Sequence, residues 1–230
     1  LVLVGVIVFL MRRNVVRLKR FNMQELNDWP RKDATIILVT EIMLMSAFLL
    51  MNASDSILQS RGVGHYIQAG SFPVSSFLVP FLSSLSDGSL ELLERSCWWF
   101  HIIGIFAFLN YLPYSKHLHI FLSFPNTYYS NLDSKGRFTN MENVTREVRL
   151  MLDPSAVPPP ADSQDPQRFG AKDVYDLTWK QLMDAYTCTE CGRCTSVCPA
   201  NQTGKKLSPR KIMMDTRDRL EEVGRAIDTH

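Results

Sequence analysis

Residues 188–199 read CTECGRCTSVCP. This stretch holds four cysteines, Cys188, Cys191, Cys194 and Cys198, in the C-x2-C-x2-C-x3-C-P spacing of a bacterial-type 4Fe–4S site. The main alternative is a structural zinc site, in which two cysteine pairs are usually separated by about a dozen residues or more. Because the four thiols stand here in one short run, the spacing predicts an iron–sulfur cluster.

The ligand count leaves two alternatives for Cys198. In two-cluster ferredoxins the fourth cysteine of such a run binds the other cluster, and a second run of four cysteines completes both ligand sets. The 230-residue chain has only one further cysteine, Cys97, which stands alone in an apolar stretch and is expected to be a small buried residue. Either Cys198 closes a single cluster, or it reaches a second cluster whose own cysteines lie beyond His230. We favour the second alternative and expect two clusters in the full-length protein.

The composition divides the chain into two halves. Residues 1–125 are rich in Leu, Phe, Ile and Met, whereas residues 126–230 are polar and charged. Apolar runs at residues 1–11, 34–51 and 92–114 suggest three membrane crossings, although the first is short. Because a signal peptide carries its basic residues before its apolar core, and here they follow it, we expect the chain to be a fragment that begins inside a membrane helix.

The basic residues predict the orientation in the membrane. Five of them follow the first apolar run within residues 12–20, whereas residues 52–95 contain only Arg61 and Arg95. Excess Lys and Arg mark cytoplasmic loops, so residues 52–95 are expected outside and everything after about residue 124 inside. A set of unoxidised cysteines belongs in that reducing compartment. We therefore expect the cytoplasmic membrane of a bacterium, with the iron–sulfur domain facing the cytoplasm.

The polar half is expected to be helical around a linker. Residues 126–170 include five prolines and predict a semi-rigid connection, with one helix near residues 141–151. Residues 171–230 predict an amphipathic helix before the cysteines and a second helix with Ser208 as its N-cap. The buried stripe of this second helix is expected to comprise Ile212, Leu220, Val223 and Ile227. The predicted fold is all-α: a partial transmembrane helical bundle (1–125), the linker region (126–170) and an α-helical ferredoxin-like iron–sulfur domain (171–230).

Two histidines suggest a second cofactor. His101 and His119 are 18 residues apart, which on an ideal α-helix is five turns, so both rings would lie on one face about 27 Å apart. That arrangement is typical of axial ligands to two haem b groups across a bilayer, and histidines inside a membrane are often functional. The alternative is that His119 is an ordinary surface histidine and that Pro113 bends the helix.

Other features indicate less about function. Glu41, in the second apolar run, could relay protons or contact a quinone headgroup, but we favour a carboxylate at the inner interface, hydrated or paired with Arg31 or Lys32. Basic residues are scattered, which predicts no binding to nucleic acid. The sequence contains no Ser–His–Asp set, phosphate-binding loop or dinucleotide fingerprint.

The residues around the cysteines resemble a known family. Residues 176–201 (DLTWKQLMDAYTCTECGRCTSVCPAN), with GKKLSPRK after them, resemble the ferredoxin-like part of heterodisulfide-reductase-type iron–sulfur subunits. They are also similar to the iron–sulfur subunits of anaerobic glycerol-3-phosphate dehydrogenase and glycolate oxidase. The resemblance implies an α-helical module with two 4Fe–4S clusters, in which Cys188, Cys191 and Cys194 hold one cluster and Cys198 reaches the other.

The membrane half resembles the cytochrome b-type gamma subunit of respiratory nitrate reductase. The resemblance rests on WWFHIIG (98–104) and PYSKHLHI (113–120). It implies that His101 and His119, and not His117, bind haem b, each haem taking a further histidine from an earlier helix.

Together these features predict a membrane-bound electron-transfer subunit of a respiratory oxidoreductase. It would pass electrons between membrane quinone or haem b and cytoplasmic 4Fe–4S clusters that serve a heterodisulfide-reductase-like or flavoprotein partner. We find no substrate site of its own in the sequence, so whether it is an enzyme stays open. The alternative is a haem-free membrane anchor whose structural metal site docks a partner subunit.

Overall fold

The computed structural model describes residues 1–68, 70–134, 136–137, 140–153, 155 and 170–229. Every regular element among these residues is an α-helix or a 3₁₀ turn, which confirms the predicted all-α fold. Most of the proline-rich stretch of the predicted linker lies outside the described residues.

The chain forms two compact units that alternate along the sequence. The first unit comprises residues 1–118 and 189–207, and the second comprises residues 119–188 and 208–230. The predicted division into three regions at residues 125 and 170 concerns function as well as compactness, and it stays a prediction.

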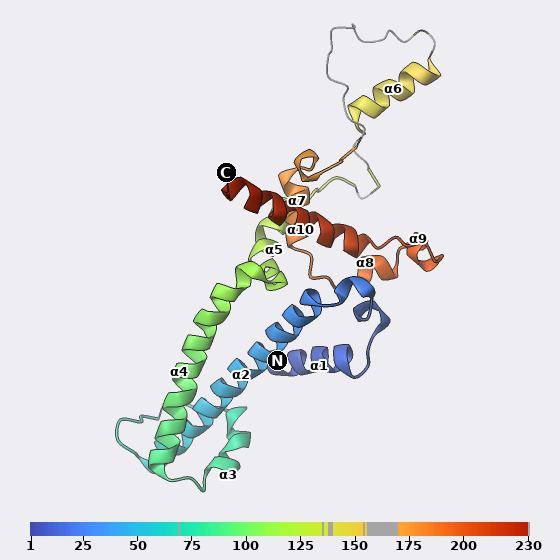
Figure 1. Cartoon of the computed structure of the whole chain (residues 1–230). Coiled ribbons are helices and arrows are strands. Elements are labelled where there is room, and N and C mark those ends of the chain that lie inside the picture. Colours follow the sequence, from blue (N-terminus) through green and yellow to red (C-terminus); the bar gives the residue numbers. More distant parts are fainter. Residues whose placement is uncertain (69, 135, 138–139, 154, 156–169, 230) are drawn as a thin grey trace. The chain divides into compact units, whose positions relative to one another are not determined.

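Three longer helices form most of the first unit. They are α1 (Val2–Asn14), α2 (Trp29–Arg61) and α4 (Asp87–Tyr111), with the short helices α3 (Val79–Leu82), α8 (Arg193–Ser196) and α9 (Pro199–Gln202) beside them (Figure 1). Helix α2 has Pro30 in its first turn, where the missing N–H of a proline costs no hydrogen bond because the first N–H groups of a helix have no partner within it. It ends at Arg61, and the following Gly62, with a left-handed backbone (φ 66°), caps the last turn by donating its N–H to the carbonyls of Leu58 and Gln59.

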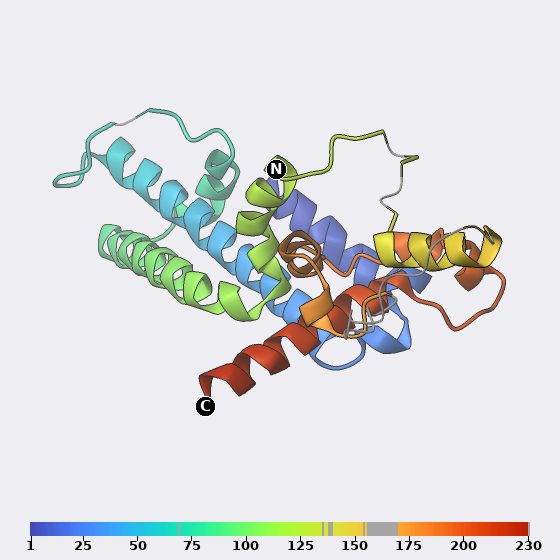
Figure 2. The ribbon, with the colours of Figure 1, turned by 90° about the horizontal axis from the view of Figure 1, so that it is seen from above.

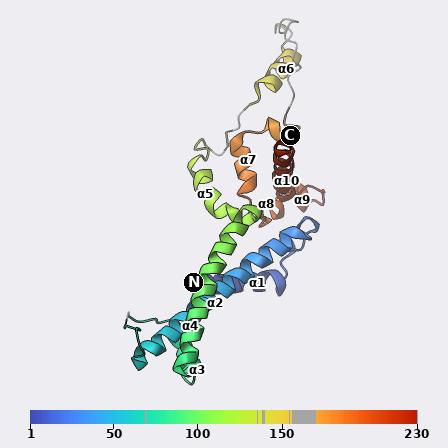
Figure 3. The ribbon, with the colours of Figure 1, turned by 60° about the vertical axis from the view of Figure 1, so that its left-hand side comes forward.

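Helices α2 and α4 pack side by side and run antiparallel (Figures 2 and 3). Ile57 and Leu58 of α2 form a buried core with Leu90 near the start of α4. Farther along the pair, Gly104 lies so close to α2 that a Cβ atom added to it would come within 2.6 Å of Leu44 Cδ2. The missing side chain at Gly104 therefore permits the close approach of the two helices.

The outer surfaces of this helix pair are apolar. Helix α2 and the segment Asp87–Tyr114 have the length and composition needed to cross a membrane. Their large exposed hydrophobic side chains include Ile36, Val39, Met43, Phe48, Trp99, Phe100, Ile103, Phe106 and Leu109. Among the described residues these are the two candidate spans, whereas the sequence suggested three; α1 has 13 residues.

Helix α4 does not continue to His119, and this corrects one expectation from the sequence. It ends at Tyr111, and a 3₁₀ turn at Leu112–Tyr114 and an extended Ser115 follow. Pro113 explains the break, since it lacks the N–H that would continue the helix and its ring would clash with the preceding turn. His101 and His119 therefore do not lie on one continuous helix.

The second unit contains α5 (His119–Tyr128), α6 (Glu142–Leu152), α7 (Trp179–Tyr186) and α10 (Pro209–Asp228). Helix α7 packs against both α5 and α10. Thr178 and Gln181 form a capping box at the start of α7, each side chain accepting a hydrogen bond from the other residue's N–H. Ser208 caps α10 through the N–H of Lys211, with Pro209 as the first helical residue, which confirms the predicted start of this helix.

Candidate iron–sulfur site

The four cysteines occupy four different local positions. Cys188 follows α7 in the second unit, and its N–H bonds the carbonyl of Ala185 (3.3 Å). The other three belong to the first unit: Cys191 lies in a loop, Cys194 within α8 and Cys198 at the N-cap of α9. All four are free thiols, and Cys194 is exposed whereas the others are partly buried.

Two residues with left-handed backbone conformations flank Cys191. Gly192 (φ 71°) is the N-cap of α8, and a glycine adopts this conformation without strain. Glu190 (φ 56°) adopts it as well, which is uncommon for a residue with a side chain. Glu190 therefore needs a compensating interaction, and its side chain provides one.

The carboxylate of Glu190 is buried against the ammonium of Lys116 in a short ion pair. Lys116 Nζ also donates to the carbonyl of Pro30 (2.8 Å), and the backbone N–H of Lys116 donates to Asp33 Oδ2 (3.1 Å). Burial lowers the pKa of Lys116, although the charge of Glu190 acts in the opposite direction. One lysine thus joins the loop before Cys191 to the first turn of α2.

Asp33 is the second buried charge of this network, with 2% of its surface exposed. Its Oδ1 atom accepts hydrogen bonds from Tyr111 Oη (2.6 Å) and Ser115 Oγ (2.7 Å). We call Asp33, Tyr111, Ser115, Lys116 and Glu190 the anchor network. The anchor network fixes the cysteine loop of the first unit to the start of α2 and to the turn that follows α4.

The donor set in this stretch fits a 4Fe–4S cluster. Glu190, the one acidic residue between Cys188 and Pro199, forms an ion pair with Lys116, so the cysteine thiols are the candidate ligands in this stretch. Among the described residues, no three His, Cys, Asp or Glu side chains are close enough to hold a single metal ion. A cubane cluster has separate iron atoms for its cysteines, so its ligands do not converge on one ion. Which of the cysteines bind stays a prediction.

His101 is oriented by the backbone of the neighbouring helix. Its Nδ1 atom lies 3.0 Å from the carbonyl oxygen of Leu44 in α2, and its ring lies 5.6 Å from that of Phe48. Because a carbonyl only accepts hydrogen bonds, Nδ1 of His101 is the donor of this contact, which leaves Nε2 as the ring nitrogen available to a ligand. Histidines that bind a metal usually make such a hydrogen bond from the other ring nitrogen, which fixes the orientation of the ring.

The other histidines of this region have different surroundings. His119 is the first residue of α5, in the second unit, and is partly buried. His117 lies in the first unit, with Nε2 at 3.9 Å from Glu41 Oε1 and its ring 5.3 Å from that of Phe108. The ionisable neighbour of Glu41 is thus His117, rather than the Arg31 or Lys32 considered from the sequence.

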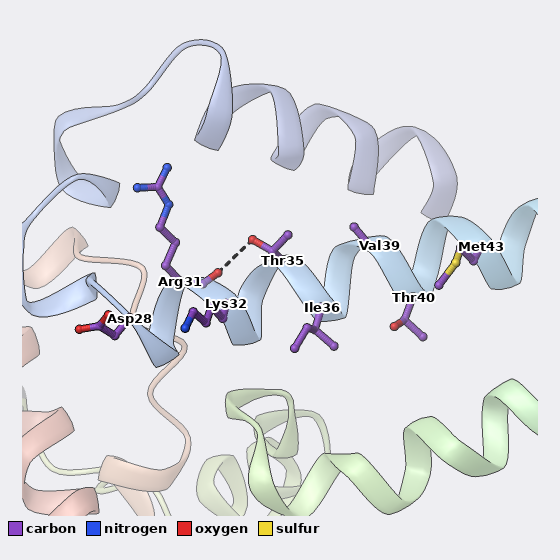
Figure 4. Close-up of a pocket in the computed structure, with 8 residues that line it drawn as sticks. All are labelled: Asp28, Arg31, Lys32, Thr35, Ile36, Val39, Thr40 and Met43. Carbon is purple, nitrogen blue, oxygen red and sulfur yellow. Dashed lines mark hydrogen bonds between the residues drawn. The ribbon is translucent and has the colours of Figure 1, made fainter.

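A groove of about 730 Å³ follows one side of α2 (Figure 4). Its polar end has Arg31 and Lys32, and its sides combine threonines with apolar residues; the lining comprises Asp28, Arg31, Lys32, Thr35, Ile36, Val39, Thr40 and Met43. A second groove, of about 310 Å³, shares Ile36, Thr40 and Met43 and continues to Gly104 and Tyr111 of α4. Such a lining suits a hydrophobic molecule with a polar head.

Comparison with known proteins agrees with the cysteine site. The family model "4Fe-4S binding domain" matches residues 179–200. The probable iron–sulfur-binding oxidoreductase FadF of Bacillus subtilis (strain 168) is 31% identical over 184 residues, covering 80% of this chain and 23% of that protein. No solved structure matches the chain.

Two further relatives extend the comparison. The EtfAB:quinone oxidoreductase of Syntrophomonas wolfei is 29% identical over 191 residues, covering 81% of this chain and 24% of that protein. A probable membrane-anchored ferredoxin of Chromohalobacter salexigens is 44% identical over 47 residues, covering 20% of this chain and 7% of that protein. The chain spans about a quarter of the length of the first two relatives. A 4Fe–4S binding domain is therefore present, in a chain that resembles part of iron–sulfur oxidoreductases.

Proposed function

We propose that this chain is the membrane-anchoring and electron-transfer part of an iron–sulfur oxidoreductase. In this proposal it connects a quinone in the cytoplasmic membrane with 4Fe–4S clusters on the cytoplasmic side. The matching 4Fe–4S family and the similarity to an oxidoreductase named for a quinone support the two ends of this path. A bound cluster supplies one-electron chemistry, and the residues of this chain hold its position.

The anchor network is the observation that carries the proposal. Lys116 pairs with Glu190, one residue before Cys191, and its N–H binds Asp33 in the first turns of α2. A ligand loop that only docked a partner would not need two buried carboxylates to fix it to apolar helices, since burying charges is costly. Fixing the loop there gives cysteine ligands and membrane helices a constant separation, which electron transfer requires.

The groove along α2 is the candidate quinone site. A quinone has carbonyl oxygens that accept hydrogen bonds and an apolar tail. The side chains of Arg31, Lys32 and Thr40 can donate at the polar part of the groove, while Ile36, Val39 and Met43 offer an apolar surface for the tail.

Haem b is a second cofactor that the residues of this chain could support. The contact of His101 Nδ1 with the Leu44 carbonyl orients the ring as an axial ligand requires, and the resemblance to nitrate reductase gamma subunits adds His119. The continuous helix expected to carry both histidines is absent, so His101 is the better supported of the two. When bound, haem b would supply a further one-electron carrier inside the membrane.

The finer organisation belongs to the same proposal. Residues 1–125 would be a cytochrome b-like membrane domain, 126–170 a linker region and 171–230 the ferredoxin-like domain of a longer protein. Cys198 would then reach a second cluster. The redox partner on the cytoplasmic side would be a heterodisulfide-reductase-like subunit or a flavoprotein.

Electron paramagnetic resonance (EPR) and optical spectra of the full-length protein test the proposal. Protein purified without oxygen should be brown and should give an EPR signal of reduced 4Fe–4S clusters after addition of dithionite. A colourless protein with stoichiometric zinc would support the alternative of an anchor with a structural metal site. For haem b, the reduced-minus-oxidised spectrum should show b-type bands that are lost in His101→Ala; a spectrum without such bands removes haem from the account.

A further inference from the structure

A pocket lined by arginines lies beside the cysteine loop in the first unit. Its volume is about 230 Å³, and we call it the arginine pocket. Its lining comprises Phe9, Arg12, Arg13, Arg20, Phe21, Leu38, Cys191 and Arg193. These residues come from α1, the 3₁₀ turn after it, α2 and the start of α8, so the pocket is assembled by the fold.

The charged side chains that line the arginine pocket are all positive. Four arginines line it and no carboxylate does. Within the part of the chain that the structure describes, Arg12 and Arg193 form no ion pair, and Arg13 donates only to the carbonyl of Arg31 (3.2 Å). The Nε atom of Arg13 is buried with no hydrogen-bond partner among the same residues. Like charges repel and an orphaned buried donor is costly, so the pocket suits an anion with several acceptor oxygens.

The apolar walls of the pocket narrow the choice of anion. Phe9, Phe21 and Leu38 contribute carbon surface, and the guanidinium of Arg20 lies 5.0 Å from the centre of the Phe21 ring. Phe9 is itself largely exposed on α1. An anion that also carries hydrocarbon would contact both kinds of surface, whereas a small inorganic ion would use the arginines alone.

We propose that the arginine pocket binds the phosphate group of an anionic phospholipid. Guanidinium groups bind phosphate through paired N–H donors, and basic pockets between helices on the cytoplasmic side of a membrane are suited to lipid headgroups. Free phosphate shares the same chemistry, but the apolar walls favour the lipid. The inference goes beyond electron transfer and rests on the proposed membrane location.

Bound lipid would also act on the cysteine loop. Cys191 and Arg193 form one wall of the arginine pocket, and Arg12 and Arg13 of α1 form another. A phosphate that bridges these walls would hold α8 against α1. The lipid headgroup would thus be a structural ligand of the segment 189–198, which carries three of the four cysteines.

The test measures lipid retained by the full-length protein that carries its clusters. The protein is placed in nanodiscs of phosphatidylcholine with graded phosphatidylglycerol, extracted with mild detergent and analysed for bound lipid by native mass spectrometry. Arg12→Gln with Arg13→Gln removes two charges from the pocket. Arg17→Gln with Lys19→Gln removes two charges from the same basic segment outside the pocket and is the matched control. A parallel sample in phosphatidylcholine receives inorganic phosphate alone.

The wild type and the control variant should retain phosphatidylglycerol selectively, and the pocket variant should bind it roughly tenfold more weakly or worse. Equal loss in both variants would overturn the proposal, since it would indicate a diffuse basic surface. Unchanged lipid binding with a shifted cluster reduction potential would also overturn it, because the arginines would then serve the cluster. If the protein in phosphatidylcholine retained inorganic phosphate, and did so through the pocket arginines, the site would belong to a soluble anion and the lipid proposal would be wrong.

Two controls keep this test separate from the proposed function. The EPR signal of the cluster reports the electron-transfer proposal and is recorded on every sample. If the double variant Arg12→Gln with Arg13→Gln does not fold, Arg193→Gln carries the test instead, because Arg193 is exposed on the opposite wall. A protein with an intact EPR signal and no selective lipid binding would refute the lipid site alone.

Discussion

At the scale of single residues, Lys116 has the most demanding position in the first unit. Its side chain is 9% exposed and pairs with the side chain of Glu190, which is 2% exposed. Buried charges are tolerated when they are paired and hydrogen-bonded, and Lys116 Nζ has both a charged partner in Glu190 and a hydrogen bond to the carbonyl of Pro30. The pair therefore adds specificity to the position of the cysteine loop more than it adds stability.

Removing Lys116 should be strongly destabilising. Lys116→Met removes the ammonium that pairs with the buried carboxylate of Glu190, so we expect a loss of about 3–5 kcal/mol in the free energy of unfolding. The double variant Lys116→Met with Glu190→Gln removes both charges and should recover part of that loss. Denaturation in detergent followed by circular dichroism measures both variants. Additive effects of the two substitutions would contradict the buried pair.

Cys191→Ser should abolish the EPR signal of the cluster that this cysteine binds. Serine is a poor replacement for a thiolate ligand, whereas the same change at Cys97 in α4 removes a thiol that lies outside the motif. The iron content and EPR signal of Cys97→Ser should equal those of the wild type. Equal iron loss in both variants would argue against the assigned ligand.

Single residues also show what the sequence could reveal. The cysteine spacing predicts the cluster because its ligands are local in the chain. The anchor network was missed because Lys116 and Glu190 are 74 positions apart and the backbone of Lys116 is 83 positions from Asp33. The one local signal of the anchor network was Asp33, a carboxylate at the start of an apolar run. Because charged residues stand directly before it in the sequence, the pattern did not single it out.

At the scale of elements, the α2–α4 pair depends on Gly104. A side chain there would meet Leu44, whose carbonyl accepts the hydrogen bond of His101. Residues 101 and 104 lie one turn apart on the same side of α4, so the close approach and the histidine contact depend on each other.

Gly104→Ile should therefore separate the helices and release His101. The end of the Leu44 side chain can rotate away from an alanine, so Gly104→Ala should cost only about 1 kcal/mol, whereas Gly104→Ile should cost about 1–3 kcal/mol or more. Leu44→Ala in the same chain should recover part of the loss in Gly104→Ile. Detergent denaturation of the four proteins measures this, and an isoleucine variant as stable as wild type would refute the close contact.

The start of the 3₁₀ turn at Val174–Asp176 is held to α10 by Asp173 and Arg219. Two hydrogen bonds of 3.0 and 2.8 Å join the guanidinium to the carboxylate, and they lower the pKa of Asp173 to about 2. A depressed pKa means that this contact stabilises the fold above about pH 4, the ordinary value for aspartate, and that the contribution is lost as the pH falls through about 2.

Arg219→Gln should return the pKa of Asp173 toward its ordinary value. A carboxyl-resolved NMR titration of the wild type, of Arg219→Gln and of Arg225→Gln measures this. Arg225 is on the same helix but pairs with Glu221, so its loss should leave Asp173 unchanged. Equal pKa values of Asp173 in all three proteins would show that the contact does not form in solution.

The helices themselves were partly predictable. The caps at Thr178 and Ser208 are local, and so are the starts of α7 and α10. The buried side of α10 was not: Val223 is buried as expected, but Ile212 and Ile227 are exposed and Met214 is buried instead. Hydrophobicity alone does not say which side of a helix faces its neighbours, and α10 buries Met214 and Val223 rather than the whole expected stripe.

At the scale of the whole molecule, the antiparallel helices α2 and α4 place different structures at the two ends of the first unit. The start of α2 and the end of α4 meet at the anchor network, whereas the segment 62–86 connects the helices at the other end. In the proposed orientation, the anchor network faces the cytoplasm and the segment 62–86 faces outward.

Labelling in intact cells tests this orientation. A membrane-impermeant maleimide should react with Ser71→Cys, in the connection between α2 and α4, and should not react with Asn22→Cys, between α1 and α2. Cell lysis should make Asn22→Cys reactive. The reverse pattern would invert the proposed orientation, and equal reaction of both in intact cells would exclude a membrane-spanning hairpin.

Composition predicted an apolar half and a polar half, and the two apolar helices and the 4Fe–4S domain follow that division. The compact units do not, because residues 189–207 pack with the first unit while the residues on either side of them pack with the second. The reason is physical: Glu190 finds its partner at Lys116, and α8 packs against the turn at Lys19–Phe21. Such pairings between distant segments leave no trace in local composition.

The most direct test of the central claim is electron exchange between quinone and cluster in proteoliposomes. The EPR signal of the 4Fe–4S cluster is followed after a quinone is added to the reduced protein, and after a quinol is added to the oxidised protein. The account predicts a quinone-dependent change of the cluster signal in at least one direction, lost in Cys191→Ser and retained in Cys97→Ser. A cluster whose redox state responds to neither addition would contradict it.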